Sequence, residues 1–365
     1  MILDECLDVA RRARDLNERR DAFYRTRPSR QEMKVFREVL VGPIFFSRRA
    51  DDALLDLAAA TDPDNPFLVG AYMRAQRALG LDAWIVGEET RGTLRSAALG
   101  VIKSGRIRRS LFINSLPSFP SDSDFWRGLE DFCAEHGITD LELATRASPE
   151  SIIPPIRGEL ERIGRAEFVL RLAGRDIHAG MSNHHRARVR KGTKRGLTIR
   201  VSRDSVALDA HIALHMHSML RREARGEEVP LEFARVGPLA YLEAGAGSLY
   251  QAILRDEVVS SLMILRSATG AYFESGGSSS EGMRIGASHF LLFQTAVSLQ
   301  AEGVETFFLG GARPSEEGLR AYKAGFGAVP VDTESVSAYV GGRLRRRVSA
   351  AVESIQNAIK AGKHG

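Results

Sequence analysis

The order of the predicted elements between residues 205 and 340 constrains the fold most strongly. Apolar spacing predicts a long helix over 205–225, which ends at Gly226. Three strand-like segments follow, joined by tight turns at Arg255-Asp256 and at 268–270; they cover residues 248–254, 257–266 and 271–274. The remaining pattern is helix, strand, helix, strand, over residues 284–302, 305–309, 315–325 and 329–340. This order predicts an α+β domain whose mostly antiparallel sheet is flanked by helices.

The first half of the chain shows a looser version of the same order. Its strand-like segments cover residues 83–86, 96–103, 108–114, 140–145 and 166–172. Helical patterns cover 122–136 and, after two prolines, the end of 150–163. We therefore expect two tandem domains, over residues 1–173 and 174–340, with a C-terminal helix in 341–365. The N-terminal domain is expected to be degenerate and to lie on the acceptor side. Residues 2–20 are expected to form an amphipathic helix.

Composition narrows the class of protein. The chain has 365 residues and a net charge of +5, and it contains only two cysteines. Two cysteines exclude a disulfide framework and a cysteine-rich metal site, and they are typical of a reducing compartment. The charged N-terminus has no apolar signal region, and no segment is apolar enough for a membrane span. We expect a soluble, cytoplasmic protein.

Much of the positive charge is concentrated in one segment. Between Asp176 and Asp204 there is no acidic residue, whereas eight basic residues are present: Arg186, Arg188, Arg190, Lys191, Lys194, Arg195, Arg200 and Arg203. Residues 176–194 are expected to form one basic helix, on which Arg186, Arg190 and Lys194 share one face. Such a face suits phosphate groups, whether of tRNA, a nucleotide diphosphate or coenzyme A. The alternative is an ordinary solvated basic surface.

Two further features fit a ligand cleft. Glu274 ends a predicted strand, where a carboxylate could act as a base for an attacking ammonium; alternatively it faces solvent at an edge. Gly310 and Gly311 end another strand, where glycine lets the backbone approach a ligand closely; the alternative is a plain turn.

The histidines do not predict a metal site. His211 and His215 are spaced as metal ligands on a helix, but the glutamate of an H-E-x-x-H motif is absent and no cysteine lies nearby. We expect no bound metal, and we expect this helix to line the acceptor cleft.

Two segments carry a family resemblance: NHHRARVRKGTKRGLTIRV at 183–201, and the region 250–331 that ends in LGGARPSEEGLRAYKAGFGAVPV. Together they resemble the Fem-type, BioF2-like branch of the GNAT acyltransferase superfamily. The resemblance covers residues 175–335 closely and the first half only by architecture. The chain lacks a clear Q/R-x-x-G-x-G/A loop, the usual pyrophosphate cradle of acetyl-CoA users; its nearest match is Met283–Ala287.

The resemblance implies several site residues. In Fem-type enzymes, the lysine that matches Lys323 lies in the active site, where a fixed cation would stabilise an oxyanion. Alternatively, Lys323 is a surface residue on a terminal helix. Arg222 and Arg225 match a basic helix end that meets acceptor phosphates. The other candidate substrate or anion contacts are Arg186, Arg190, Lys191, Lys194, Tyr272, Gly310, Gly311 and Tyr322.

The resemblance also implies a transferase. We expect transfer of an aminoacyl group from aminoacyl-tRNA to an amine of a cell-wall precursor or a peptide natural product, without a tightly bound cofactor. The expected partners are charged tRNA and the amine acceptor. The alternatives are an acyl-CoA-dependent N-acyltransferase and an inert GNAT-like module that binds anions or nucleic acid.

Overall fold

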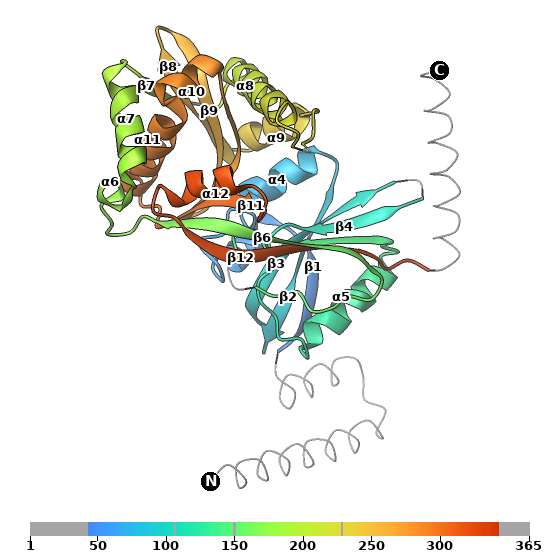
Figure 1. Ribbon diagram of the computed structural model, residues 1–365. Coiled ribbons are helices and arrows are strands. Elements are labelled where there is room, and N and C mark those ends of the chain that lie inside the picture. The colour runs from blue at the N-terminus through green and yellow to red at the C-terminus, as the bar shows by residue number, and fades with distance from the viewer. Residues whose placement is uncertain (1–42, 106, 149–150, 228, 343–365) are drawn as a thin grey trace, which may run out of the picture.

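A computed structural model describes residues 43–105, 107–148, 151–227 and 229–342. The predicted helices over 2–20 and 343–360 lie outside these residues. The described strands form one 12-stranded mixed sheet in the order β1-β2-β3-β4-β5-β12-β6-β11-β10-β9-β8-β7 (Figure 1). The strands are β1 (Ile44–Arg49), β2 (Asp82–Thr90), β3 (Thr93–Ser104), β4 (Arg109–Ile113), β5 (Asp140–Ala144), β6 (Glu159–Arg171), β7 (Thr198–Ser202), β8 (Gly247–Leu254), β9 (Glu257–Arg266), β10 (Gly270–Ser278), β11 (Thr306–Ala312) and β12 (Val329–Tyr339).

The two halves of the sheet repeat one pairing pattern. In the first half, β2, β3 and β4 pair antiparallel and β4 then pairs parallel with β5. In the second half, β8, β9 and β10 pair antiparallel and β10 then pairs parallel with β11. This repeated order is the tandem GNAT-like architecture that the sequence predicts.

Strands β6 and β12 join the two halves into one sheet. β12 pairs antiparallel with both β5 and β6, and β6 pairs antiparallel with β11. The last described strand of the chain therefore lies beside strands of the first half, and Figure 1 shows β12 running alongside β6 through the middle of the molecule. The domain boundary near Ala173-Gly174 stays a prediction.

Helices cover both faces of the sheet. They are α3 (Asp52–Ala59), α4 (Gly70–Ala78), α5 (Asp124–Glu135), α6 (Ile177–Gly180), α7 (Asn183–Lys194), α8 (Ser205–Glu223), α9 (Val236–Glu243), α10 (Ser280–Ile285), α11 (Ala287–Ala301) and α12 (Glu317–Ala324). In the second half, α7 and α11 pack on one core, while α8 and α9 pack on a separate core. Helices α3 and α4 share a core with Tyr272 and Phe308, so this core spans both halves. No helix among the described residues is long and apolar enough to cross a membrane.

Two local predictions were wrong. The helical pattern predicted at the end of 150–163 is the first half of strand β6, which is 13 residues long and pairs with β12. The pairing with β12 comes from far along the chain and overrides the local pattern. The single basic helix predicted over 176–194 is two helices, because the chain turns at Met181 and Ser182 caps α7 by accepting a hydrogen bond from His185 N.

Strands β10 and β11 separate towards their carboxyl ends, and the candidate site lies where they separate. They pair only from Gly270 to Tyr272 and from Thr306 to Phe308. Beyond these residues, each strand has a register shift against its outer neighbour, between Phe273 and Ser275 in β10 and between Phe308 and Gly311 in β11. The sheet therefore opens between the carboxyl ends of two parallel strands, where ligands of mixed sheets commonly bind.

Candidate active site

Lys323 fills the opening between β10 and β11. It lies near the end of α12, is 5% exposed, and donates hydrogen bonds of 2.8 Å to the Gly310 carbonyl oxygen and 2.9 Å to the Gly311 carbonyl oxygen. Burial lowers the pKa of Lys323 to about 8, while the nearby carboxylates of Glu167 and Glu316 act in the opposite direction. An ammonium has three N–H donors, so one donor remains for a ligand.

Gly310 is required at this position by its backbone conformation and its neighbours. Its φ of +74° lies in the left-handed region, where side chains other than glycine are disfavoured. A Cβ at Gly310 would lie 3.7 Å from the Tyr272 hydroxyl and 3.8 Å from Lys323 Nζ. The hydroxyl and the ammonium thus converge on the same glycine, which leaves backbone and polar groups, rather than a side chain, at the opening.

Glu167 is a site residue that the sequence reasoning missed. It lies on β6, is 1% exposed, and its Oε2 accepts a 2.9 Å hydrogen bond from Ala147 N. Burial raises the pKa of Glu167 to about 7, although the Ala147 N–H, Arg146, Lys323 and Tyr272 all favour its ionised form. A lone acid within the apolar strand segment AEFVLRL is the sequence signal that could have identified it.

Groups from both halves also meet around Glu274. Burial raises the pKa of Glu274, and the charge of Arg146, which follows β5, opposes that shift. Tyr72 of α4 and Tyr241 of α9 stack with ring centroids 5.6 Å apart; burial raises the pKa of both hydroxyls, and the charge of Glu274 adds to this effect. Arg146 is exposed; desolvation is the largest influence on its pKa, but the charges of the neighbouring tyrosines and glutamates outweigh it and raise that pKa.

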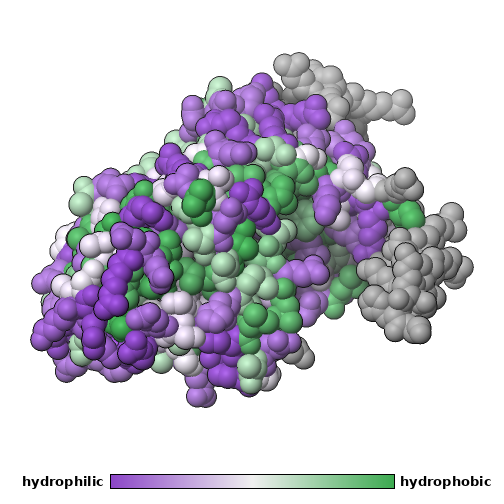
Figure 2. Space-filling view, turned by 90° about the horizontal axis from the view of Figure 1, so that it is seen from above, coloured by the Kyte–Doolittle hydropathy of each residue, from purple (hydrophilic) through white to green (hydrophobic). Residues whose placement is uncertain are grey.

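The sequence reasoning did not identify Arg146, Tyr72 or Tyr241, because they reach the site only through the folding of the first half against the second. Apolar side chains gather near the middle of the face in Figure 2, with hydrophilic regions on either side. The arrangement of the site offers two cations, Lys323 and Arg146, two carboxyl groups with raised pKa values and several phenolic hydroxyls. These groups can hold an acceptor and accept its proton.

Helix α7, which carries the basic residues, is joined to the α12 segment by hydrogen bonds. The Gly325 carbonyl accepts a hydrogen bond of 2.8 Å from Ser182 N, and His185 Nε2 lies 2.9 Å from the Tyr322 carbonyl oxygen. Arg190, Lys191 and Lys194 are exposed and form no ion pair with the described residues. Arg186 is held within its own segment, because it donates to the Asn183 side chain and to the Ala179 carbonyl oxygen.

Other predicted residues are engaged elsewhere. Arg222 forms ion pairs with Glu227 and Glu316, and Arg225 pairs with Glu227, so protein carboxylates already neutralise both arginines. The hydroxyl of Tyr322 donates to the Ser288 carbonyl oxygen at 3.1 Å, within a ring cluster formed with His185, His289 and Phe326. Tyr322 therefore points away from the opening that Lys323 fills.

The predicted helix that carries His211 and His215 is α8, in which His211 has a structural role. Its two ring nitrogens each lie 3.0 Å from a serine hydroxyl, those of Ser261 and Ser275. His215 stacks on Phe233 with ring centroids 4.1 Å apart. Among the described residues, no group of three or more histidine, cysteine, aspartate or glutamate side chains is placed to hold a metal ion.

The helices after β10 do not present a phosphate cradle. The Ser279 side chain caps α10 by accepting a hydrogen bond from Gly282 N. Helix α11 begins beyond Gly286, whose φ is +86°, and a Cβ there would lie 2.6 Å from the Arg188 carbonyl oxygen. Helix α7 therefore packs closely over the start of α11, in the Met283–Ala287 region that most resembles a pyrophosphate loop.

Comparisons with known proteins agree with this architecture. Residues 179–324 match the family model described as an acetyltransferase (GNAT) domain. Among solved structures, the fold is similar to that of FemX, with a TM-score of 0.57 and 12% identity over 79% of this chain and 96% of that chain. It is also similar to a tandem GNAT protein from the clavulanic acid biosynthesis pathway, with a TM-score of 0.50 and 14% identity over 82% and 99% of the two chains. No curated protein sequence matches at a significant level.

The family match covers α7, the opening between β10 and β11, and α12 as far as Lys323. The sequence identities to the two solved structures are so low that these similarities concern the fold alone. The shared fold includes the first half of the chain as well. The chain therefore carries a GNAT acetyltransferase domain over residues 179–324, within a fold that is similar to those of FemX and a tandem GNAT protein.

Proposed function

We propose that the protein transfers an aminoacyl group from aminoacyl-tRNA to an amine, in a cell-wall precursor or a peptide natural product. The observation that carries this proposal is the position of the exposed cations of α7, which is attached to the helix of Lys323. Phosphates bound along Arg190, Lys191 and Lys194 would place a tRNA acceptor end next to the opening between β10 and β11. The fold is similar to that of FemX, in agreement with the Fem-type resemblance of the sequence, and it is this resemblance that implies an aminoacyl-tRNA donor.

The site supplies groups for each part of this reaction. The acceptor ammonium gives a proton to a carboxylate, for which Glu274 is the candidate because this half-buried carboxyl group has a raised pKa and lies near Arg146. The amine nitrogen then forms a bond to the ester carbonyl carbon, and Lys323 stabilises the oxyanion with its remaining N–H. The bond from that carbon to the tRNA ribose oxygen breaks, and the ribose hydroxyl leaves with one proton.

A second candidate donor is acyl-CoA. The description of the matched family as an acetyltransferase domain favours this donor. The close packing of α7 over the start of α11 favours the tRNA donor instead, because it leaves the Met283–Ala287 segment without an open helix end for a pyrophosphate.

The test is the salt dependence of binding to charged tRNA. We expect the logarithm of the association constant to fall steeply as salt rises, and the slope to decrease by about 1.5 when Arg190 and Lys194 are both replaced by alanine. Arg48→Ala with Arg95→Ala is the matched control, because both arginines are exposed on the first half of the sheet. If the association constant for charged tRNA changes neither with salt nor with the α7 substitutions, and acetyl-CoA stabilises the protein against thermal unfolding, the acyl-CoA donor is favoured.

A further inference from the structure

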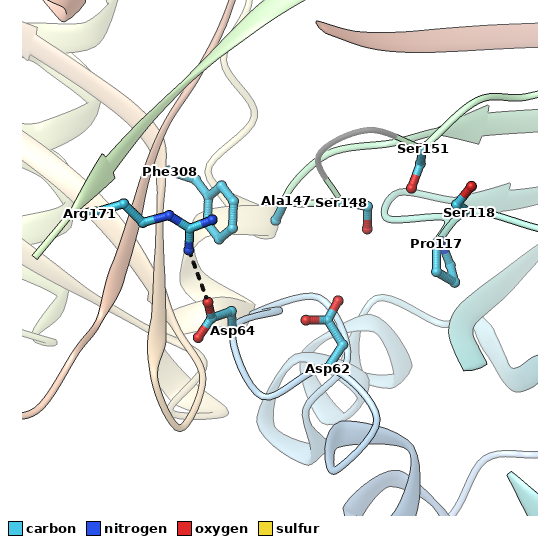
Figure 3. A pocket seen from close by; sticks show the side chains of 9 residues that line it. All are labelled: Asp62, Asp64, Pro117, Ser118, Ala147, Ser148, Ser151, Arg171 and Phe308. Carbon is cyan, nitrogen blue, oxygen red and sulfur yellow. Dashed lines mark ion pairs between the residues drawn. The ribbon is translucent and has the colours of Figure 1, made fainter. Parts of the chain in front are cut away.

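A cavity outside the candidate active site lies on the sheet face that α3 and α4 cover. Its volume is about 270 Å³, which is enough for a small polar molecule. It lies between the loop that carries Asp62 and Asp64, the segment around Ser148, and strands β6 and β11 (Figure 3). The lining residues are Asp62, Asp64, Pro117, Ser118, Ala147, Ser148, Ser151, Arg171 and Phe308.

The two aspartates in this cavity differ in their partners. Asp64 accepts hydrogen bonds from the hydroxyls of Thr269 and Thr306, and it forms an ion pair of 3.6 Å with Arg171. Asp62 accepts a hydrogen bond of 3.2 Å from the Asn65 side chain but has no cationic partner among the described residues. Burial and the charge of Asp64 raise the pKa of Asp62. Asp62 is therefore the carboxylate in this cavity that lacks a counter-charge.

A hydroxyl that lines the cavity also lacks a protein partner. The residue Ser151 is 6% exposed, and its hydroxyl, which is open to the cavity, forms no hydrogen bond with the described residues. The Ser148 hydroxyl, which is 2.8 Å from the Ser115 hydroxyl, keeps capacity for one more hydrogen bond. In Figure 3, the hydroxyls of Ser148 and Ser151 and the carboxylate of Asp62 are turned into the same space from different sides. These three groups are therefore available to one ligand in the cavity.

We propose that this cavity is a binding site for a small amine that also carries hydroxyl groups. Its ammonium would pair with Asp62, and its hydroxyls would bond to Ser148 and Ser151. The ring of Phe308, only 2% exposed, and Pro117 offer apolar surface for the carbon skeleton. Arg171 stays bound to Asp64 and Thr306, so it does not compete for Asp62. This site does not depend on the transferase reaction.

The cavity and the opening filled by Lys323 share one wall. Ala147 lines the cavity, while its backbone N–H donates to Glu167, whose charge acts on Lys323. The backbone of Ala147 has a φ of +52°, a conformation that costs free energy for a residue other than glycine.

The test compares two pairs of probes by isothermal titration in an amine-free phosphate buffer. Serinol and glycerol differ only by an ammonium in place of a hydroxyl, and glucosamine and glucose form a larger pair with the same difference. We expect at least one amine to bind with a millimolar dissociation constant, at least about tenfold more tightly than its uncharged counterpart.

Variants locate the site. Asp62→Asn keeps the oxygen that accepts from Asn65, and we expect it to remove the preference for the amine. Ser151→Ala should weaken binding severalfold. Asp56→Asn is the matched control, because Asp56 is an exposed acid on α3 that lies outside the cavity. The proposal is overturned if neither amine binds more tightly than its uncharged counterpart, or if the preference survives in Asp62→Asn.

Discussion

The ammonium of Lys323 lies 2.8 Å from the carbonyl oxygen of Gly310, at the point where β10 and β11 separate. This contact fixes the position of a buried cation at the end of two parallel strands. The glycine backbone leaves space beside it, and Tyr272 and Glu167 approach from the opposite face of the sheet. The chemistry that we propose for the site depends on this placement.

Glu167 should set the protonation of Lys323. The carboxylate raises the pKa of Lys323 against the larger effect of burial, so Glu167→Gln should lower that pKa below its value of about 8. Since the proposed mechanism needs the ammonium, activity falls as pH rises through this pKa. We expect the basic limb of the pH–rate profile to move to lower pH in Glu167→Gln. The exposed residue Glu142 provides the control, Glu142→Gln. A basic limb that stays in place or moves to higher pH would contradict this role.

The same substitution should change stability in a pH-dependent way. The folded protein holds the pKa of Glu167 at about 7, above its ordinary value of 4.5, so between these values the folded state binds more protons than the unfolded state. The contribution of this group to stability is present below pH 4.5 and is lost as pH rises to 7. Glu167→Gln should therefore gain stability relative to wild type between pH 5 and 8, by an amount of order 1 kcal/mol or more. Urea denaturation at the two pH values measures the difference, and a constant difference would contradict the raised pKa.

Two histidines, the fully buried His211 and the half-buried His289, should make the fold sensitive to acid. Burial lowers the pKa of His211 and of His289 to about 3, with nearby histidines adding to the effect. The unfolded state then binds more protons below pH 6.5, so stability falls as pH decreases through this range. Each histidine contributes about 1.4 kcal/mol per pH unit. We expect His211→Gln and His289→Gln to show a smaller loss of stability between pH 7 and 5 than wild type. The exposed residue His184 provides the control, and His184→Gln should leave the slope unchanged.

The close approach of α8 to β10 should depend on Gly277. A Cβ at Gly277 would lie 2.2 Å from the Leu214 carbonyl oxygen, so Gly277→Ala must displace the helix that carries His211 and His215. We expect a loss of about 1–3 kcal/mol in the free energy of unfolding. At Gly318 in α12, a Cβ would meet nothing within 4 Å, so Gly318→Ala should be neutral or slightly stabilising. Equal effects of the two substitutions on thermal unfolding would show that the close packing is not maintained.

Local sequence signals predicted most of the second half. The turn between β8 and β9 is tight because Arg255 and Asp256 both adopt positive φ angles, of 49° and 69°. The segments on either side of this turn have a local strand pattern, which predicts β8 and β9 without information from the rest of the chain. Lys323 is buried, which excludes the alternative of a surface lysine, while its role in the reaction stays a prediction.

Long-range pairing explains what the sequence did not reveal. Strand β6 is a strand because β12 pairs with it, and residues 159–163 carry no local pattern that shows this. Arg146 follows β5 and Tyr241 lies on α9, and they meet at Glu274 only after the two halves form one sheet. The residues of the cavity that contains Asp62 come together in the same way, since Asp62, Ser151 and Arg171 lie on segments far apart in the sequence.

The most direct measurement is single-turnover transfer of a labelled aminoacyl group from charged tRNA to an amine acceptor, compared between wild type and Lys323→Met. Methionine keeps a long apolar stem but removes the cation, and Lys103→Met on β3 is the exposed control. We expect Lys323→Met to stay folded and to lose at least about 100-fold in rate, whereas Lys103→Met should match wild type. A folded Lys323→Met protein that transfers as fast as wild type would contradict the proposed role of Lys323, and wild type that transfers only from acyl-CoA would contradict the proposed donor.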